Sequence, residues 1–224
     1  IFKDQLTQLK VDSKKLGTQG KGIDFSLLVD GLAAEREQGI TIDVAYRYFT
    51  TAERKFIVAD TPGHEQYTRN MVTGASLADL AIILVDARKG VLTQTRRHSY
   101  LINLLGVKNI VLAVNKMDLV DYEGKTFNHV VSDYRDFASF TETKKFLAIP
   151  ISGVNGDNII TKSDQMTWYQ GHSLMHYLET IEITSKKEET SFSMPIQWVN
   201  RPHLDFRGFA GQITSGVINR GDKI

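Results

Sequence analysis

The chain has 224 residues, of which 42% are hydrophobic, so it is long enough to bury the core of one domain and part of a second. Its 27 Lys and Arg residues almost balance its 26 Asp and Glu residues, and a formal net charge of +1 gives no overall field that points to a nucleic-acid or membrane partner. The sequence has no cysteine, membrane-span pattern or secretory-signal core, which excludes disulfides and thiolate chemistry and favours a cytoplasmic globular protein.

Short apolar segments alternate with longer segments of helical periodicity through most of the chain. This alternation is typical of an α/β fold with a mostly parallel sheet and flanking helices. We expect strands at residues 44–50, 54–59, 80–85, 110–114 and 146–151, and helices at residues 66–74, 93–105, 126–140 and 173–181. The first two strands would form a hairpin. The near-continuous apolar character of the others predicts strands that are covered on both faces.

A polar run without apolar periodicity, residues 184–193, marks the best domain boundary. We predict an α/β domain over residues 1–184, a linker over 185–193 and the beginning of a second domain over 194–224. In that second domain, short strands with glycine turns are expected at residues 195–200, 206–213 and 216–224. They resemble the opening of a β-barrel.

Residues 115–118 follow a predicted strand and carry the groups that distinguish guanine from adenine. The carboxylate of Asp118 can accept two hydrogen bonds from the ring N–H and exocyclic amino group of guanine, an edge that adenine lacks. Asn115 would tie neighbouring loops together and contact the base, while the aliphatic stem of Lys116 would cover the ring. A helix-capping Asp after a strand is the alternative reading. The candidate base-binding residues here are Asn115, Lys116, Met117 and Asp118.

Residues 60–64 end another predicted strand and suit a terminal phosphate with magnesium. Asp60 would hold Mg²⁺ through a water, and the backbone N–H of Gly63 would approach the phosphate closely because glycine has no side chain. His64 would orient an attacking water, a role that depends on the position of the side chain more than on its basicity. The alternative interpretation is that His64 is only a polar residue of a turn. The candidates here are Asp60, Thr61, Pro62, Gly63 and His64, with His64 as the catalytic residue.

Thr41 is a second candidate catalytic residue and a magnesium ligand. It would offer its hydroxyl to the metal and its N–H to the terminal phosphate, ordering a switch loop only while that phosphate is present. Taken alone, such a Thr is more often the start of a strand. Ser152, Gly153 and Val154 follow the strand predicted at residues 146–151 and would offer backbone donors to the guanine carbonyl oxygen. The four motifs in this order support one joint GTP site.

A phosphate-binding loop of the form G-x-x-x-x-G-K-[ST] would be expected before these motifs, because it supplies backbone donors, a lysine and a magnesium ligand. The early glycines Gly17, Gly20, Gly22 and Gly31 do not form that pattern. A parallel sheet without the strand that leads into this loop would expose strand edges and part of its core. We therefore favour a sequence that belongs to a longer protein, which supplies the loop, over the alternative of a fragment with poor nucleotide affinity.

On these motifs the chain resembles the translation-factor class of GTPases, and the resemblance covers nearly its whole length. Within that class it closely resembles the large GTPase subunit of bacterial sulfate adenylyltransferase. The segments that carry this closer resemblance are residues 27–49, 60–70, 86–91, 94–98, 199–202 and 204–208. The resemblance implies a P-loop NTPase-like GTP-binding domain, and GTP and Mg²⁺ as cofactors.

The same resemblance implies that GTP hydrolysis drives a smaller catalytic subunit to make adenosine 5′-phosphosulfate and pyrophosphate from ATP and sulfate. The adenylyl-transfer site would then lie in that partner, in a heterodimer or larger assembly without nucleic acid or membrane. The loops around Thr41 and His64 are the candidate coupling surface, because a terminal phosphate can order them. Gly153 stands where a close relative commonly has Ala, and little should change because that position acts through its backbone N–H.

Three alternatives stay open at this point. The chain could belong to a translation elongation factor-type GTPase that binds aminoacyl-tRNA, which the near-neutral charge weakens. It could be part of a bifunctional sulfate adenylyltransferase and adenylylsulfate kinase. It could also be a scaffold that keeps the fold without the activity, against which the residues suited to guanine reading argue. Residues 46–49 and 200–202 favour the sulfate adenylyltransferase interpretation.

Overall fold

The computed structural model describes residues 40–140, 145–183 and 191–223. The early glycines and the part of the family-like segment before residue 40 lie outside the described residues, as does most of the predicted linker. The chain divides into two compact units, with the division between Thr180 and Ile181.

The described part of the first unit alternates strands and helices, which confirms the predicted α/β class. The strands are β1 (Ala45–Thr50), β2 (Lys55–Asp60), β3 (Leu80–Asp86), β4 (Asn109–Asn115) and β5 (Leu147–Pro150). The α-helices are α3 (Thr68–Ala75), α4 (Thr93–Leu104), α5 (Gly124–Ala138) and α6 (Leu174–Thr180), and the short 3₁₀ helices are η2 (Glu65–Tyr67), η3 (Met117–Val120) and η4 (Asp164–Met166). The strands and α-helices each agree with the predicted segment to within a few residues, whereas η3 and η4 were not predicted.

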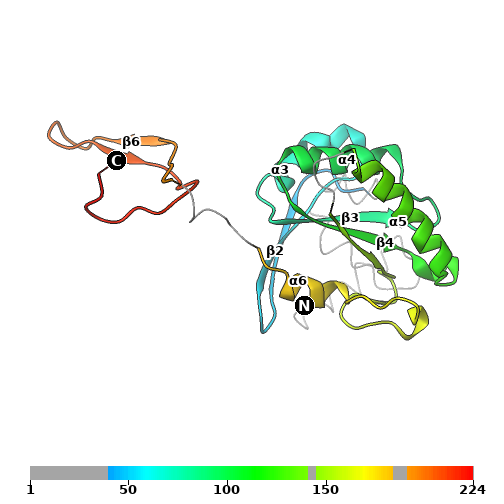
Figure 1. The fold of residues 1–224 in the computed structure, drawn as a ribbon. Helices are drawn as coiled ribbons and strands as arrows, with labels where there is room; N and C mark the ends of the chain where they lie inside the picture. Colours follow the sequence, from blue (N-terminus) through cyan, green and yellow to red (C-terminus); the bar gives the residue numbers. More distant parts are fainter. Residues whose placement is uncertain (1–39, 141–144, 184–190, 224) are drawn as a thin grey trace, which may run out of the picture. The chain divides into compact units, whose positions relative to one another are not determined.

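Strands β3, β4 and β5 form a parallel sheet in that order, with β4 in the centre. Helix α4 connects β3 to β4, and α5 connects β4 to β5, so the sheet is built from successive crossover units (Figure 1). The register places Asp86 beside Asn115 and Val114 beside Pro150. The carboxyl ends of the three strands therefore meet at one edge of the sheet, and the loops that follow them are neighbours.

The core forms on both faces of β4. Leu112 and Val114 pack in a large apolar cluster with residues of α3, α4 and α5, whereas Val111 and Ala113 pack in a second cluster with Leu174 of α6. Figure 1 shows these helices on the corresponding two sides of the sheet. Alternation along β4 thus fills both clusters, as the continuous apolar run of this strand predicts.

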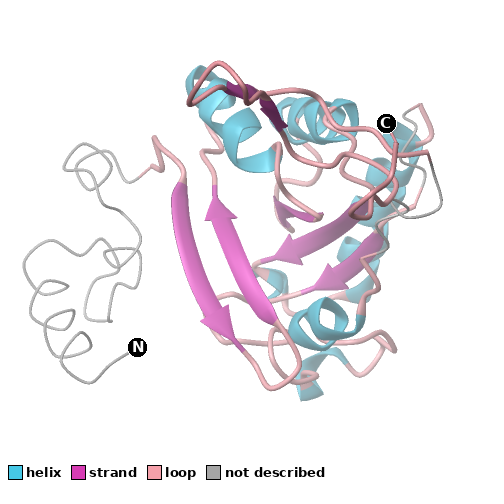
Figure 2. Ribbon diagram, turned by 90° about the vertical axis from the view of Figure 1, so that its left-hand side faces the viewer, coloured by secondary structure: helices cyan, strands magenta, loops and turns pink. Residues whose placement is uncertain are grey.

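Strands β1 and β2 form a separate antiparallel pair, with Thr50 opposite Lys55 at the turn and Ala45 opposite Asp60 at the far end. Figure 2 shows this long pair apart from the parallel sheet. Leu84 in β3 is 62% exposed, so the predicted burial of β3 on both faces is wrong within the described residues. The physical reason is that the larger core cluster takes in the alternate residues Ile83 and Val85, whereas no described element covers Ile82 and Leu84 on the opposite face.

Two short strands pair in the second unit, β6 (Trp198–Asn200) and β7 (Gly208–Ala210), which are antiparallel. The strand predicted over residues 216–224 is wrong for its described part, residues 216–223, which form no strand. Gly216 and Gly221 adopt φ angles of 69° and 102°, and the backbone N–H of Asn219 donates to the Asp222 carboxylate. Left-handed glycines and this local bond make turns rather than an extended strand.

Helix α3 lies against the segments that contain Thr41 and Asp60. The side-chain amide of Asn70 donates to the carbonyl oxygen of Ile42 at 2.8 Å. Gly74 faces Thr61 and Val44 so closely that a Cβ atom on Gly74 would lie 2.6 Å from the Thr61 methyl. The absence of a side chain at Gly74 therefore lets one helix contact both segments at once.

We expect Gly74→Ala to lower the free energy of unfolding by about 1–3 kcal/mol, because overpacking at the Thr61 methyl outweighs the better helix propensity of alanine. Chemical denaturation would measure the difference. Thr73→Ala, at the adjacent exposed position of the same helix, is the matched control and should stay close to wild type. Unchanged or increased stability in Gly74→Ala would show that the contact is not tight.

Candidate functional site

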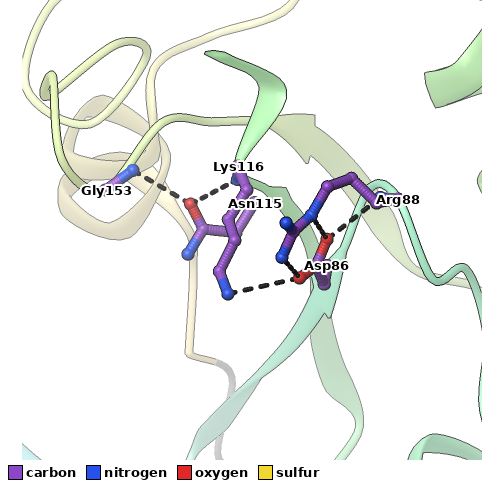
Figure 3. A network of polar contacts seen from close by, with 5 residues as sticks. All are labelled: Asp86, Arg88, Asn115, Lys116 and Gly153. Atoms are coloured by element: carbon purple, nitrogen blue, oxygen red, sulfur yellow. Dashed lines mark hydrogen bonds and ion pairs between the residues drawn. The ribbon is translucent and has the colours of Figure 1, made fainter. Parts of the chain in front are cut away.

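The side chain of Asn115, the last residue of β4, joins the loop after β4 to the loop after β5. Its Oδ1 accepts hydrogen bonds from the backbone N–H of Lys116 at 2.7 Å and of Gly153 at 2.9 Å (Figure 3). Lys116 adopts a left-handed backbone with φ 65°, which is unusual for a residue other than glycine. The bond from its N–H to Asn115 therefore helps to hold an otherwise unfavourable turn at the end of the strand.

Asp118 is held by the second of these loops. The buried Ser152 hydroxyl donates to Asp118 Oδ1 at 2.6 Å, and the Met117 N–H donates to the carbonyl oxygen of Ile151. Asp118 is itself half-buried, in the first turn of η3. One carboxylate oxygen thus already has a protein donor, which fixes the plane of the group while leaving acceptor positions for a ligand.

Asp86, at the end of β3, links the site to Arg88 and Lys116. Its carboxylate accepts two bonds from the Arg88 guanidinium, at 2.6 and 3.0 Å, and its Oδ2 lies 3.2 Å from Lys116 Nζ (Figure 3). The Arg88 side chain, helped by the Arg88 N–H and Lys116, holds the pKa of the Asp86 carboxyl well below its ordinary value although burial opposes this. Lys116 is therefore tethered at its charged end, with its stem free to lie along a flat ligand.

A third group of contacts surrounds Tyr122, just beyond η3. Its hydroxyl donates to Asp157 Oδ2 at 2.9 Å and accepts from the Asn155 amide at 2.9 Å. The hydrogen bond from Asn155 lowers the pKa of the Tyr122 phenol, but this effect is outweighed. Partial desolvation and the carboxylates of Asp157 and Asp118 raise the pKa above its ordinary value. The sequence alone does not indicate these three residues, because each bonded pair is more than 30 residues apart in the chain.

The segment that follows β2 contains the predicted phosphate-side residues. Pro62 is buried, whereas Gly63 and His64 are exposed, and a Cβ on Gly63 would contact nothing within 4 Å. His64 caps η2, since its Nδ1 accepts a hydrogen bond from the Gln66 N–H at 3.3 Å. The backbone N–H of Gly63 is thus on an open surface where another group can come close.

Thr41 and Asp60 offer a hydroxyl and a carboxylate, the hard oxygen ligands that suit Mg²⁺. The contacts of α3 with Ile42 and Thr61 bring their two segments to the same helix. No cluster of three or more His, Cys, Asp or Glu residues occurs within residues 40–140, 145–183 and 191–223. One hydroxyl and one carboxylate would leave the other positions around such a cation to waters and phosphate oxygens.

The structure therefore brings together the predicted base-binding residues. Asn115, Lys116 and Asp118 lie in one loop, and Ser152 and Gly153 of the next loop contact them directly. Val154 is exposed beside them, and Met117 is buried in the core below. A donor and acceptor set of this kind, next to a tethered lysine stem, fits a purine base. The roles of individual residues toward a ligand remain predictions.

Across the described part of the chain, no helix combines the length and apolar character that crossing a membrane requires.

Comparison with known proteins gives a consistent family. The chain matches the family described as the elongation factor Tu GTP binding domain over residues 3–188. It is 63% identical to sulfate adenylyltransferase subunit 1 of Aliarcobacter butzleri, and 58% identical to the proteins of that name from Cellvibrio japonicus and Bacteroides fragilis. These alignments cover 100% of this chain and 48%, 48% and 47% of the relatives. The chain thus spans about half the length of the curated relatives it matches.

Solved structures share the fold at lower identity. A bacterial selenocysteine-specific elongation factor, EF-Sec, superposes with a TM-score of 0.56 at 21% identity, covering 96% of this chain and 33% of that one, which supports the fold alone. The elongation factor SelB from Methanococcus maripaludis, in complex with the GTP analogue GPPNHP, gives 0.53 at 25% identity and covers 81% and 38%. Sup35 complexed with GDP gives 0.52 at 26%, covering 79% and 44%.

We expect Asp86→Asn to lower the free energy of unfolding at pH 7 by about 1 kcal/mol, because Arg88 and Lys116 lose their anion while solvent screens both half-exposed cations. The depressed pKa of Asp86 stabilises the fold above the ordinary carboxyl pKa of about 3.9, and this contribution is lost as pH falls towards the folded-state pKa. The difference between variant and wild type should therefore shrink between pH 7 and pH values below about 4.

Urea unfolding at several pH values would measure this difference. Asp79→Asn is the matched control, because Asp79 is exposed and contributes its backbone carbonyl, not its carboxylate, to the bond with Asn109. It should follow wild type across the range. A difference for Asp86→Asn that stays constant down to pH 3.5 would contradict a charge-based role.

Proposed function

Because the chain belongs to the elongation factor Tu GTP-binding domain family, we propose that it is the GTP-binding part of the regulatory subunit of a sulfate adenylyltransferase. The relatives named sulfate adenylyltransferase subunit 1 support this assignment, since they are 56–63% identical over the whole chain. Their name as a subunit also supports a partner. We infer that this partner is the smaller catalytic subunit, and that the complex works in the cytoplasm.

One observation carries the proposal, the direct bonding of the two loops that carry the predicted base-binding residues. The Gly153 N–H donates to Asn115 Oδ1 and the Ser152 hydroxyl donates to Asp118 Oδ1. These bonds fix a carboxylate and an amide at the carboxyl edge of the parallel sheet, where ligands bind in open α/β folds. We propose that Asp118 accepts from the ring N–H and amino group of guanine, and that the Lys116 stem covers the ring.

The phosphate side of the site would be formed by the segments at Thr41 and Asp60. In the proposed function, Thr41 and Asp60 hold Mg²⁺, the latter through a water, and the Gly63 N–H donates to the terminal phosphate. The bound cation would supply charge that neutralises the phosphate oxygens. His64 would orient the water that attacks the terminal phosphate, so that GTP and water give GDP and inorganic phosphate.

Coupling to the partner would use the same two segments. A terminal phosphate that contacts Thr41 and Gly63 would order them, and its release would free them, so the surface offered to the partner would depend on the nucleotide. The hydrogen bond of α3 to Ile42 and the contact of α3 with Thr61 mean that both segments share one support. The partner would then form adenosine 5′-phosphosulfate and pyrophosphate from ATP and sulfate, driven by this hydrolysis.

A translation-factor function is the second candidate. The SelB and Sup35 structures favour it only weakly, because these proteins are 25–27% identical to this chain. The near-neutral net charge of the chain gives no overall attraction for tRNA, which weakens this candidate. If the protein and its partner release pyrophosphate in a sulfate-dependent reaction that GTP stimulates, the first function is supported. If the protein binds aminoacyl-tRNA tightly and this reaction is absent, the second function is supported.

We expect Asp118→Asn to weaken guanine nucleotide binding by about 10- to 100-fold and to favour xanthine nucleotides, because an amide can donate to the xanthine carbonyl that replaces the amino group. Titration of the complete protein with GDP and xanthosine diphosphate would measure both affinities. The control is Asp121→Asn, an exposed carboxylate in the same loop, which should retain guanine preference. Unchanged base preference in Asp118→Asn would remove Asp118 from base reading.

We expect His64→Ala to slow GTP hydrolysis by on the order of 100-fold while leaving GTP affinity within a few-fold of wild type, because the water loses its positioning group. Single-turnover hydrolysis would measure the rate. His64→Asn separates this role from capping, since Asn caps helices well but is shorter than His. Hydrolysis restored by Asn would assign the loss to the cap of η2, and wild-type rates in both variants would remove His64 from the mechanism.

A further inference from the structure

The loop that carries Asp118 has an unusual backbone. Lys116, Asp121 and Tyr122 have φ angles of 65°, 50° and 55°, so three residues other than glycine adopt the left-handed conformation within seven positions. This conformation is unfavourable for residues with a Cβ atom, and it persists where surrounding contacts hold it. The contacts at both ends of the loop therefore decide how firmly Asp118 is placed.

The first end of the loop is held by Asn115 and Asp86, as described above, and the second end by Tyr122. The Tyr122 hydroxyl donates to Asp157 Oδ2 at 2.9 Å, and the Tyr122 carbonyl oxygen accepts from the Trp168 indole N–H at 2.9 Å. The side chain and the backbone of Tyr122 are thus both bonded to the segment that follows β5. Its own N–H donates back to the Met117 carbonyl, which closes the turn around Asp118.

Asp157 is the other half of this contact, and it is bonded on all sides. Its Oδ1 accepts from the Ser163 hydroxyl at 2.7 Å, while its backbone oxygen accepts from the Ser152 N–H at 3.2 Å. Ser152 in turn donates its hydroxyl to Asp118. A closed path therefore runs from Asp118 through Ser152 and Asp157 to Tyr122, and back along the chain to Asp118.

Resting on the proposed function, we propose that Tyr122 and Asp157 are positioning residues for guanine selection. Their hydrogen bond fixes the loop after β4 against the loop after β5, which keeps the Asp118 carboxylate in the plane of a bound base. Guanine offers this carboxylate a ring N–H and an amino group, whereas hypoxanthine offers the ring N–H alone. A carboxylate that accepts both bonds of guanine must lie in the plane of the base. A small tilt of the carboxylate therefore weakens the paired bonds to guanine more than the single bond to hypoxanthine.

The test is the ratio of dissociation constants for inosine diphosphate and guanosine diphosphate, measured by calorimetric titration of the complete protein. Tyr122→Phe removes the hydroxyl and keeps the ring, and we expect it to reduce this ratio about 3- to 10-fold towards unity. Ser163→Ala, which removes the second donor to Asp157, should reduce the ratio in the same direction by a smaller factor. It answers the same question if Tyr122→Phe does not fold.

Tyr134→Phe is the matched control. It also removes a tyrosine hydroxyl, which donates at 3.0 Å to Ser99 in the core between α5 and α4, away from the two loops. It should lower the melting temperature and leave the ratio unchanged. A wild-type ratio in Tyr122→Phe would overturn the inference, even if the melting temperature falls, and would leave the proposed function intact. If Tyr122→Phe does not fold, a wild-type ratio in Ser163→Ala would do the same. Wild-type protein that fails to bind guanosine diphosphate would instead overturn both.

Discussion

Strand β4 pairs with β3 along one edge and with β5 along the other, and the positions of the base-side residues of the candidate site follow from this pairing. Burial on both faces fixes the register, because Val111 and Ala113 belong to one core cluster and Leu112 and Val114 to the other. A shift by one residue would exchange these faces and place each side chain in the wrong cluster. The same register sets Asp86 beside Asn115, so the core determines which side chains can meet at the sheet edge.

The loops beyond the strands depend on polar contacts rather than on the core. Every buried side-chain nitrogen or oxygen in the described part of the chain has a partner, which includes the Ser152 hydroxyl and the Asn158 amide. Asn158 also has a left-handed backbone, with φ 55°, and its amide bonds to the Pro150 carbonyl and the Ser163 N–H. The segment after β5 is therefore internally fixed, and it can act as a rigid support for the neighbouring loop.

The sequence predicts the strands of the first unit and places the candidate base-side motifs directly after them, because both depend on local patterns. The apolar run of β4 followed by Asn115 is an example, since one short segment contains both the strand and the start of the site. Contacts between Tyr122 and Asp157 could not be predicted in this way, because 35 residues separate them and neither type is distinctive alone. The exposed face of β3 was missed for a related reason: composition shows that Leu84 is apolar, but not which element covers it.

The cap that His64 provides to η2 also assigns its protons. Because Nδ1 accepts from the Gln66 N–H, the neutral imidazole that makes this bond is the tautomer with its hydrogen on Nε2. Such a ring presents a donor, not a lone pair, to whatever lies beyond it. In the capped form, His64 would therefore hold a water through the oxygen of that water, and the proton lost on attack would have to pass to another acceptor, such as the phosphate itself.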